Sequence, residues 1–298
     1  LAAARRDDLD LTWARGVAAT GLDLGARTLA LADGRALPFD GVVIATGAAP
    51  RRIPGTRGRP GVHVVRTLDD ATALAAALAT AERVVVVGAG FIGAEVAASC
   101  RARGLAVTLV EPLAQPLARV LGEPVGAVVA DVHREHGVDV RLGVGVASIA
   151  TGPDGGPVVA LDDGSTVAAD AVVVGIGVIP ATGWLEGSGL TLDDGVVCDA
   201  TTLAAPGVVA AGDVARWPNE AFGGEVMRVE HWEHAIDMGG HAARRLLAGD
   251  GPGEAYRPVP WFWSDQYDRK LHLAGRVRPD DRFEVVAGSL DERRFTAL

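Results

Sequence analysis

The segment that begins at Gly88 carries residues whose types and spacing suit the binding of a dinucleotide. A strand at residues 84–87 runs into Gly88-x-Gly90-x-x-Gly93 and then into a helix. In this pattern the first glycine allows a tight turn, the second lets backbone approach a pyrophosphate, and the third lets helix and strand pack closely. The helix N-terminus offers free N–H groups to the phosphates. The complete unit favours a nicotinamide dinucleotide site over a purely structural glycine turn.

An acidic residue, Glu111, ends the strand that follows this helix. A carboxylate at this position can accept hydrogen bonds from the ribose hydroxyls of adenosine, and it would repel a 2′-phosphate. The sequence therefore favours NAD(H) over NADP(H). Arg119 keeps the second possibility open, because a nearby arginine can accommodate a 2′-phosphate.

An internal repeat sets the domain organisation. Residues 31–50 read LADGRALPFDGVVIATGAAP and residues 161–180 read LDDGSTVAADAVVVGIGVIP, with 8 of 20 positions identical, Gly47 and Gly177 among them. Each copy reads as a turn, a buried strand and a glycine-containing crossing, which predicts two related α/β domains. A glycine fingerprint precedes the second copy. The same offset before the first copy falls ahead of Leu1, so we expect the chain to lack the beginning of its first domain.

Composition narrows the class of protein. A chain of 298 residues with 49% hydrophobic residues can form two domains with separate cores. The net charge of −10 argues against nucleic-acid binding. Cys100 and Cys198 form no C-x-x-C pair and are expected to be small buried residues. The apolar runs are too short to cross a membrane and no secretory signal is visible, so we expect a cytoplasmic protein.

The order of predicted elements is strand–helix–strand in the middle of the chain and strand-rich at both ends. This order predicts a parallel sheet. From Tyr256 onward the composition shifts toward aromatic residues and arginine, which suggests a third, smaller domain. The predicted helices cover residues 69–80, the stretch after Gly90, 124–136 and 232–248, and the predicted antiparallel ribbon covers 138–149, 157–162 and 166–170.

Four motifs resemble those of the FAD-dependent, NADH-using ferredoxin reductases of multicomponent oxygenase systems, in the pyridine nucleotide-disulfide oxidoreductase superfamily. They span nearly the whole chain, and the last is the most specific to the reductases. The motifs are ATGAAPRRIPG at 45–55, VVVVGAGFIGAEVAA at 84–98, TTLAAPGVVAAGDVA at 201–215 and PWFWSDQYDRKLHLAG at 260–275.

The resemblance implies a fold. It is an α/β fold with two Rossmann-like dinucleotide-binding domains, for FAD and NAD, the first truncated, plus a partial carboxy-terminal α+β domain. The FAD domain would comprise 1–70 and 193–252, the NAD domain 71–192, and the interface domain 253–298. The family's amino-terminal glycine-rich FAD fingerprint is absent from this chain.

The resemblance also implies roles for single residues. Asp213 would bond the ribityl chain of the flavin, and Trp232 would lie at the edge of its ring. Arg51 would meet the FAD phosphates, and the backbone of Val17 would meet adenine. Glu95 would lie near the nicotinamide amide. Simpler roles compete: a helix cap for Asp213, a core position for Trp232, and exposed positions for Arg51 and Glu95.

The function implied by the resemblance is electron transfer from NADH through FAD to a small iron–sulfur protein, a ferredoxin. The cofactors perform this chemistry, so the sequence offers no catalytic triad or carboxylate pair. His231 and His234 lie one turn apart, but no third ligand is evident, so no metal site is expected. Two alternatives stay open: a related flavoprotein with rubredoxin, a quinone or an organic radical as acceptor, and a non-catalytic NAD(H)-binding fragment.

Overall fold

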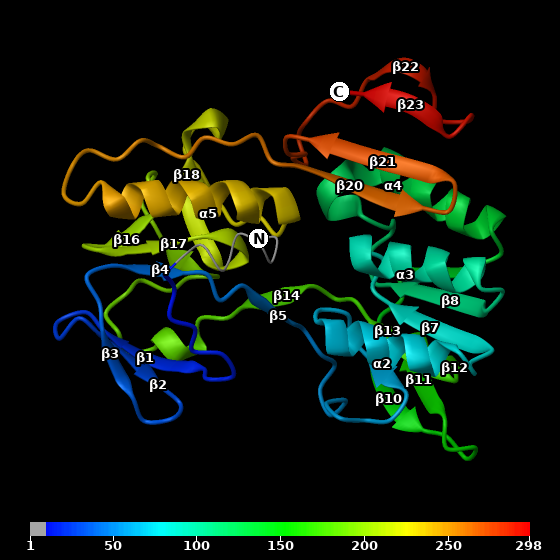
Figure 1. Cartoon of the computed structure of the whole chain (residues 1–298). Helices are drawn as coiled ribbons and strands as arrows, with labels where there is room; N and C mark the ends of the chain where they lie inside the picture. The colour runs from blue at the N-terminus through cyan, green and yellow to red at the C-terminus, as the bar shows by residue number, and fades with distance from the viewer. Residues whose placement is uncertain (1–9) are drawn as a thin grey trace. The chain divides into compact units, whose positions relative to one another are not determined.

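The structure is a computed structural model that describes residues 10–298 (Figure 1). The chain divides into two compact units, each built from separate stretches of sequence. Unit 1 holds the described residues up to Gly47 together with Pro180–Glu230 and Ala235–Pro258. Unit 2 holds Ala48–Ile179, His231–His234 and Val259–Leu298. The assignment of residues to three domains stays a prediction.

Unit 2 is built on a five-stranded parallel sheet. The order of its strands is β6 (Val62–His63), β13 (Ala171–Val174), β7 (Arg83–Val87), β8 (Ala106–Glu111) and β9 (Asp139–Leu142). Side chains alternate between the two faces of a strand. Val84 and Val86 therefore enter one apolar cluster, whereas Val85 and Val87 enter another. Because both faces are buried, β7 reads as an uninterrupted run of valines.

Helices cover one face of this sheet. Helix α2 (Leu68–Leu78) begins at Thr67, whose side chain accepts from the Asp70 backbone while the Asp70 carboxylate accepts from the Thr67 backbone, a reciprocal cap. Helix α3 (Phe91–Ala102) packs on β7 and β8. Helix α4 (Ala118–Glu135) begins earlier than predicted, and Gly122, with φ of 76°, kinks it just before Pro124. A proline fits the first turn of the second helical piece.

An antiparallel ribbon covers the other face. It consists of β10 (Val146–Thr151), β11 (Pro157–Leu161) and β12 (Thr166–Ala168). Ile149, Val159 and Leu161 pack on Val85 and Val87 of the sheet. The prediction that 138–149 belongs wholly to the ribbon was wrong, because residues 139–142 form β9, which pairs in parallel with β8. The apolar alternation of this stretch does not distinguish the two kinds of pairing.

Unit 1 contains three small sheets and, from Ala235 onward, one long helix. The sheets are β1 (Ala19–Asp23) with β2 (Thr28–Leu31) and β3 (Ala36–Pro38); β16 (Leu203–Ala205) with β17 (Val208–Ala210) and β4 (Val42–Ile44); and β15 (Val196–Val197) with β18 (Ala215–Asn219) and β19 (Glu225–Met227). Helix α5 (Trp232–Leu247) matches the predicted 232–248. Trp217 and Met238 are fully buried in the core of this unit.

The structure confirms the internal repeat. β3 and β4 of the first copy correspond to β12 and β13 of the second, at the offset that separates Leu31 from Leu161. The crossings correspond as well: β5 (Ala48–Pro50) matches β14 (Val178–Pro180), and these two strands pair with each other.

The carboxy-terminal residues contribute two hairpins. The first joins β20 (Trp261–Gln266) to β21 (Arg269–Ala274), and the second joins β22 (Val285–Ser289) to β23 (Arg294–Ala297). Tyr267, in the turn of the first hairpin, has φ of 56°. Both hairpins group with unit 2.

Candidate functional site

The glycine turn between β7 and α3 is tightly packed at two of its three glycines. Gly88 has φ of 92°, and a Cβ added there would lie 2.4 Å from the carbonyl oxygen of Gly175. A Cβ added at Gly93 would lie 1.8 Å from the carbonyl oxygen of Gly88. These two positions accept glycine alone, as the sequence pattern predicted, because the turn and the helix approach each other at backbone contact.

The middle glycine is open. Gly90 is the N-cap of α3 and has φ of −72°, no side chain caps the helix there, and a Cβ added to it would meet no atom within 4 Å. The first backbone N–H groups of a helix have no partner within the helix. The turn therefore presents unbonded donors and free space together, which fits the pyrophosphate of a dinucleotide.

Glu111 has a bracing role that the sequence did not reveal. Glu111 is 8% exposed. Oε2 accepts the backbone N–H of Ala89 at 2.7 Å, and Oε1 accepts that of Leu113 at 3.1 Å. Leu117 in turn donates its backbone N–H to the carbonyl of Ala89 at 3.1 Å. Glu111 thus holds the glycine turn in place, and a carboxylate retains acceptor capacity beyond two such bonds. Arg119 is exposed in the first turn of α4.

The glycine-containing crossing of the second repeat copy packs against the glycine turn between β7 and α3. Gly175 donates its backbone N–H to Val87 at 2.8 Å, and Gly177 follows with φ of 89°. Arg51 donates its backbone N–H to Gly177 at 2.9 Å and its side-chain Nε to the carbonyl of Val178 at 3.1 Å. The structure thus brings Gly177 and Arg51 together inside unit 2.

Glu95 lies in the second turn of α3 and faces the first carboxy-terminal hairpin. Its Oε1 accepts the hydroxyl of Ser264 at 2.7 Å. Burial raises the pKa of Glu95 and the charge of Asp265 raises it further, whereas the bond from Ser264 lowers it. Glu95 is therefore a partly buried, bonded carboxylate and not a surface residue. Sequence reasoning missed Ser264, although polar residues at alternate positions of WFWSDQ on an otherwise buried strand face were a usable signal.

The residues assigned to the flavin are partly placed in unit 1. Parallel pairing of β4 with β17 brings their carboxyl ends together, and Gly212 and Asp213 follow β17 in a short 3-10 helix, Gly212–Val214. Ligands of open α/β sheets bind at such carboxyl ends. Gly212 has φ of 72°, and Asp213 and Val17 are partly buried. The flavin roles of Asp213 and Val17 stay predictions. Trp232 begins α5 and is 69% exposed, so the core alternative was wrong.

The two cysteines play no part in this site. Cys100 is buried in the apolar cluster under the sheet of unit 2, and Cys198 is buried in the core of unit 1. Burial raises the pKa of both thiols, that of Cys198 to about 12. A protonated thiol is neither a nucleophile nor a redox partner. The expectation of two small buried residues is confirmed.

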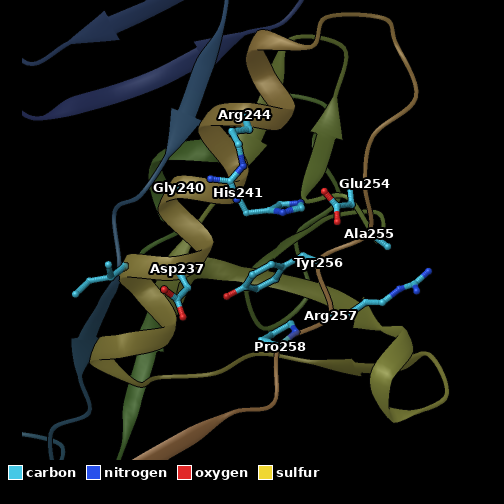
Figure 2. A pocket seen from close by; sticks show the side chains of 10 residues that line it. Asp237, Gly240, His241, Arg244, Glu254, Ala255, Tyr256, Arg257 and Pro258 are labelled. Carbon is cyan, nitrogen blue, oxygen red and sulfur yellow. The ribbon is translucent and has the colours of Figure 1, made fainter.

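A pocket in unit 1 is lined by other residues. It is lined by Asp237, His241 and Arg244 of α5 and by the segment from Glu254 to Pro258 that runs beside the helix (Figure 2). The Tyr256 and His241 rings lie 4.9 Å apart across it. It contains none of the predicted site residues.

The chain matches two protein families in sequence. Residues 5–239 match the pyridine nucleotide-disulphide oxidoreductase family, and residues 261–298 match the reductase C-terminal family. Rhodocoxin reductase of Rhodococcus erythropolis is 39% identical over 97% of this chain and 67% of its own length. Putidaredoxin reductase of Pseudomonas putida is 36% identical over 95% of this chain and 68% of its own length. The chain therefore spans about two thirds of the length of these relatives.

Solved structures agree. The ferredoxin reductase of the CYP199A2 system from Rhodopseudomonas palustris superposes with a TM-score of 0.87 at 37% identity, over 94% of this chain and 69% of the other. The putidaredoxin reductase in its covalent complex with putidaredoxin superposes with a TM-score of 0.87 at 34% identity, over 95% of this chain and 68% of the other. The chain belongs to the pyridine nucleotide-disulphide oxidoreductases and, within them, to the ferredoxin reductases. None of the helices in residues 10–298 is long and apolar enough to cross a bilayer.

Proposed function

We propose that this protein passes electrons from NADH through FAD to a small iron–sulfur protein, as the ferredoxin reductase component of an oxygenase system. FAD and NAD(H) are the cofactors of its family, and the enzyme is an oxidoreductase. The observation that carries the proposal is the free space at Gly90, which we call the cradle, between Gly88 and Gly93, where backbone leaves no room for a side chain, in a chain of this family. A cytoplasmic location, the three-domain division and the roles of single residues belong to the proposal.

The nucleotide side of the reaction depends on unit 2. The turn Gly88–Gly93 and the first N–H groups of α3 bind the pyrophosphate of NADH. Glu111 accepts from the adenosine ribose with the acceptor capacity left after Ala89 and Leu113. Glu95 accepts from the nicotinamide amide, and Gly177 gives the backbone room to approach the cofactor. These residues bind and orient, and they move no proton.

The flavin side depends on the four residues that the family resemblance assigns to FAD. Bound FAD supplies the conversion between two-electron and one-electron transfer that links NADH to an iron–sulfur acceptor. Asp213 would bond the ribityl chain and Arg51 the phosphates, while Val17 would meet adenine and Trp232 the ring edge. The N-terminus of α5 would stabilise negative charge on the reduced ring.

A glycine substitution tests the cradle. Gly90→Ala adds no backbone strain and no clash within the protein, but its methyl group occupies the space the pyrophosphate needs. We expect normal folding and an NADH dissociation constant raised by about tenfold or more, equivalent to about 1.4 kcal/mol. A fluorescence titration with NADH measures this.

Gly183→Ala is the matched control. Gly183 begins a 3-10 helix of unit 1, Gly183–Leu185, and a Cβ there also meets nothing within 4 Å. It should leave NADH binding unchanged. Equal affinity of the Gly90→Ala protein and the unaltered protein would reject the proposed site. NADH binding without any uptake of added FAD would favour the alternative of a non-catalytic NAD(H)-binding protein.

A further inference from the structure

Helix α3 is held between the sheet and the carboxy-terminal hairpin of unit 2 (Figure 1). Its Ala97 and Cys100 enter the apolar cluster on the sheet. Two other residues, Phe91 and Glu95, lie one turn apart and meet β20 instead. The Phe91 ring packs edge-on against Phe262 with centroids 4.2 Å apart, and Glu95 bonds Ser264. The helix that begins at the proposed pyrophosphate cradle is thus fixed to the hairpin by one apolar and one polar contact.

The hydrogen bonds at the polar contact run in one direction. Gln266 donates from Nε2 to the Ser264 hydroxyl oxygen at 3.2 Å, and Ser264 donates its proton to Oε1 of Glu95 at 2.7 Å. A hydroxyl has a single proton, so a donor on its oxygen leaves that proton for the carboxylate. Ser264 is 1% exposed and Gln266 5% exposed. Water therefore does not compete for these bonds.

Packing alone does not require these polar groups. Phe262 already anchors the start of β20 to α3, and the turn is anchored to α4 by the Tyr267 hydroxyl, which lies 2.8 Å from Nδ1 of His133. Burying a hydroxyl and an amide between these anchors costs free energy unless they are bonded. Both are bonded, and the chain of bonds ends on Glu95.

The bond to Ser264 uses Oε1 of Glu95, and among the described residues Oε2, the free oxygen, accepts no hydrogen bond. Because the bond to Oε1 fixes the carboxylate, it also fixes where Oε2 lies, and an ionised carboxylate can only accept, so Oε2 can take a donor from a ligand while the bond to Ser264 stays in place. A nicotinamide carboxamide carries an NH₂ donor on one side and a carbonyl acceptor on the other. A fixed acceptor therefore selects one orientation of the carboxamide.

We infer that Ser264, held by Gln266, is a positioning residue that fixes the Glu95 carboxylate so that its free oxygen accepts the carboxamide N–H of the nicotinamide. The inference rests on the proposed function, which places the nicotinamide at Glu95. The first carboxy-terminal hairpin, β20–β21, thus takes part in cofactor binding indirectly, because Ser264 acts through Glu95 and need not touch the cofactor.

The charges around Glu95 give the inference a pH signature. Burial and the charge of Asp265, an exposed residue paired with Lys270 at 3.3 Å, both raise the pKa of Glu95, and the bond from Ser264 opposes them. Removing the hydroxyl lets Glu95 take up a proton at a higher pH. A protonated Glu95 loses the charge that strengthens its bond to the amide.

The test compares two ligands of the intact chain, NAD⁺ and ADP-ribose, which lacks the nicotinamide. Ser264→Ala should weaken NAD⁺ binding about tenfold, because a Glu95 carboxylate that is no longer held in place loses its charge-assisted bond to the carboxamide. Binding of ADP-ribose should stay unchanged. The acid limb of the NAD⁺ to ADP-ribose affinity ratio should move to higher pH. Ser264→Thr keeps a hydroxyl and should retain both the NAD⁺ affinity and the acid limb of the unaltered protein. Asp265→Asn should move the acid limb to lower pH.

The outcomes separate the inference from the function on which it rests. Ser264→Ala protein that loses affinity for both ligands equally, or for neither, would show that Ser264 serves packing alone. An acid limb that stays in place in both the Ser264→Ala and Asp265→Asn proteins would also overturn the inference. If the unaltered chain binds neither ligand, the proposed function itself fails.

Discussion

Glu111 carries two tasks on one carboxylate. The sequence assigns it to the adenosine ribose, and the structure adds the bracing of the glycine turn through Ala89 and Leu113. The two tasks respond differently to substitution. Bracing needs an acceptor at each oxygen, whereas discrimination against a 2′-phosphate needs the negative charge.

Substitution of Glu111 should therefore change cofactor preference and stability together. Glu111→Ala leaves the fully buried N–H of Ala89 without an acceptor, which costs about 1–3 kcal/mol of unfolding free energy. The same variant should narrow the preference for NADH over NADPH by about tenfold, because a like-charge clash of about 1–2 kcal/mol is removed. Denaturant unfolding and parallel titrations with NADH and NADPH measure the two effects.

Glu111→Gln separates them. It removes the charge but keeps one acceptor oxygen, so the preference should narrow while more of the stability remains. If Arg119, which is exposed in the first turn of α4, accommodates the 2′-phosphate, adding Arg119→Ala to this variant should cancel any gain in NADPH affinity. An unchanged affinity ratio in both Glu111 variants would remove Glu111 from cofactor selection.

At the scale of elements, most of the fold could be predicted from the sequence because local patterns determine it. The valine run predicted β7, and the acidic residues at 69 and 70 predicted the start of α2 to within one residue. Each copy of the repeat predicted one buried strand, which is β4 in the first copy and β13 in the second. The assignment of 139–142 failed because a strand's apolar alternation does not reveal its partner. The partner of β9 is β8, which pairs through backbone groups that any sequence carries.

The site divides in the same way. Gly88, Gly93 and Glu111 could be predicted because a single local motif contains them. Ser264 could not be assigned to Glu95, because the two lie far apart in sequence and their contact depends on how the hairpin docks on α3. Long-range contacts of this kind leave a weak trace in sequence, here two polar residues on the buried face of β20.

The hairpin also binds α4, through a histidine that should make stability pH-dependent. His133 is fully buried, and burial lowers its pKa to about 4. In the unfolded chain a histidine has a pKa of about 6.5. As pH falls from about 6.5 to about 4, the unfolded state takes up a proton that the folded state does not, so the unfolding free energy falls over that window. The loss is about 3 kcal/mol at most and ends near pH 4.

His133→Asn tests this, because its amide can still bond Tyr267 but does not titrate. In this variant the unfolding free energy should depend on pH less steeply, with up to one proton fewer taken up on unfolding within the window. Some slope remains, because burial also lowers the pKa of His234 to about 4. Tyr267→Phe is the control: it removes the bond and keeps the imidazole, so stability should fall while the steep slope remains. Identical slopes for His133→Asn and the unaltered protein would contradict the assignment.

At the scale of the whole molecule, charge is distributed unevenly. Residues 256–298 hold eight basic and seven acidic residues, a net charge of +1. Because the whole chain has a net charge of −10, residues 1–255 have a net charge of −11. Part of the carboxy-terminal segment is also an exposed aromatic surface. Trp261 and Trp263 are 41% and 40% exposed with ring centroids 5.5 Å apart, so neither is a core residue.

The pairing of β20 with β21 places particular residues beside these tryptophans. Trp261, Trp263 and Asp265 lie opposite Ala274, His272 and Lys270. Directly opposed residues share a face. Lys270 therefore lies on the tryptophan face, which also carries Asp265, whereas Arg269 lies opposite Gln266 and belongs to the other face. The basic residue that could steer a partner toward the tryptophans is thus Lys270.

We expect the iron–sulfur partner to dock on this face. Small ferredoxins are typically acidic, as the family resemblance implies, and an acidic partner is steered toward the least negative surface. Lys270→Glu would place two negative charges together, Glu at 270 and Asp265, and should slow ferredoxin reduction several-fold at low ionic strength. The loss should shrink as salt is added, because exposed charges are screened. The holoenzyme is assayed by stopped flow for the two half-reactions, flavin reduction by NADH and ferredoxin reduction.

Arg282→Glu is the matched control for this last prediction. It makes the same change in net charge within the same segment, on a side chain that is 87% exposed and lies in the loop after the first hairpin, not on the tryptophan face. If steering is local to Lys270, Arg282→Glu should leave ferredoxin reduction close to that of the unaltered enzyme. Equal slowing by both variants would show that overall charge is responsible. Unchanged ferredoxin reduction with Lys270→Glu, or a loss that salt does not relieve, would place the docking surface elsewhere.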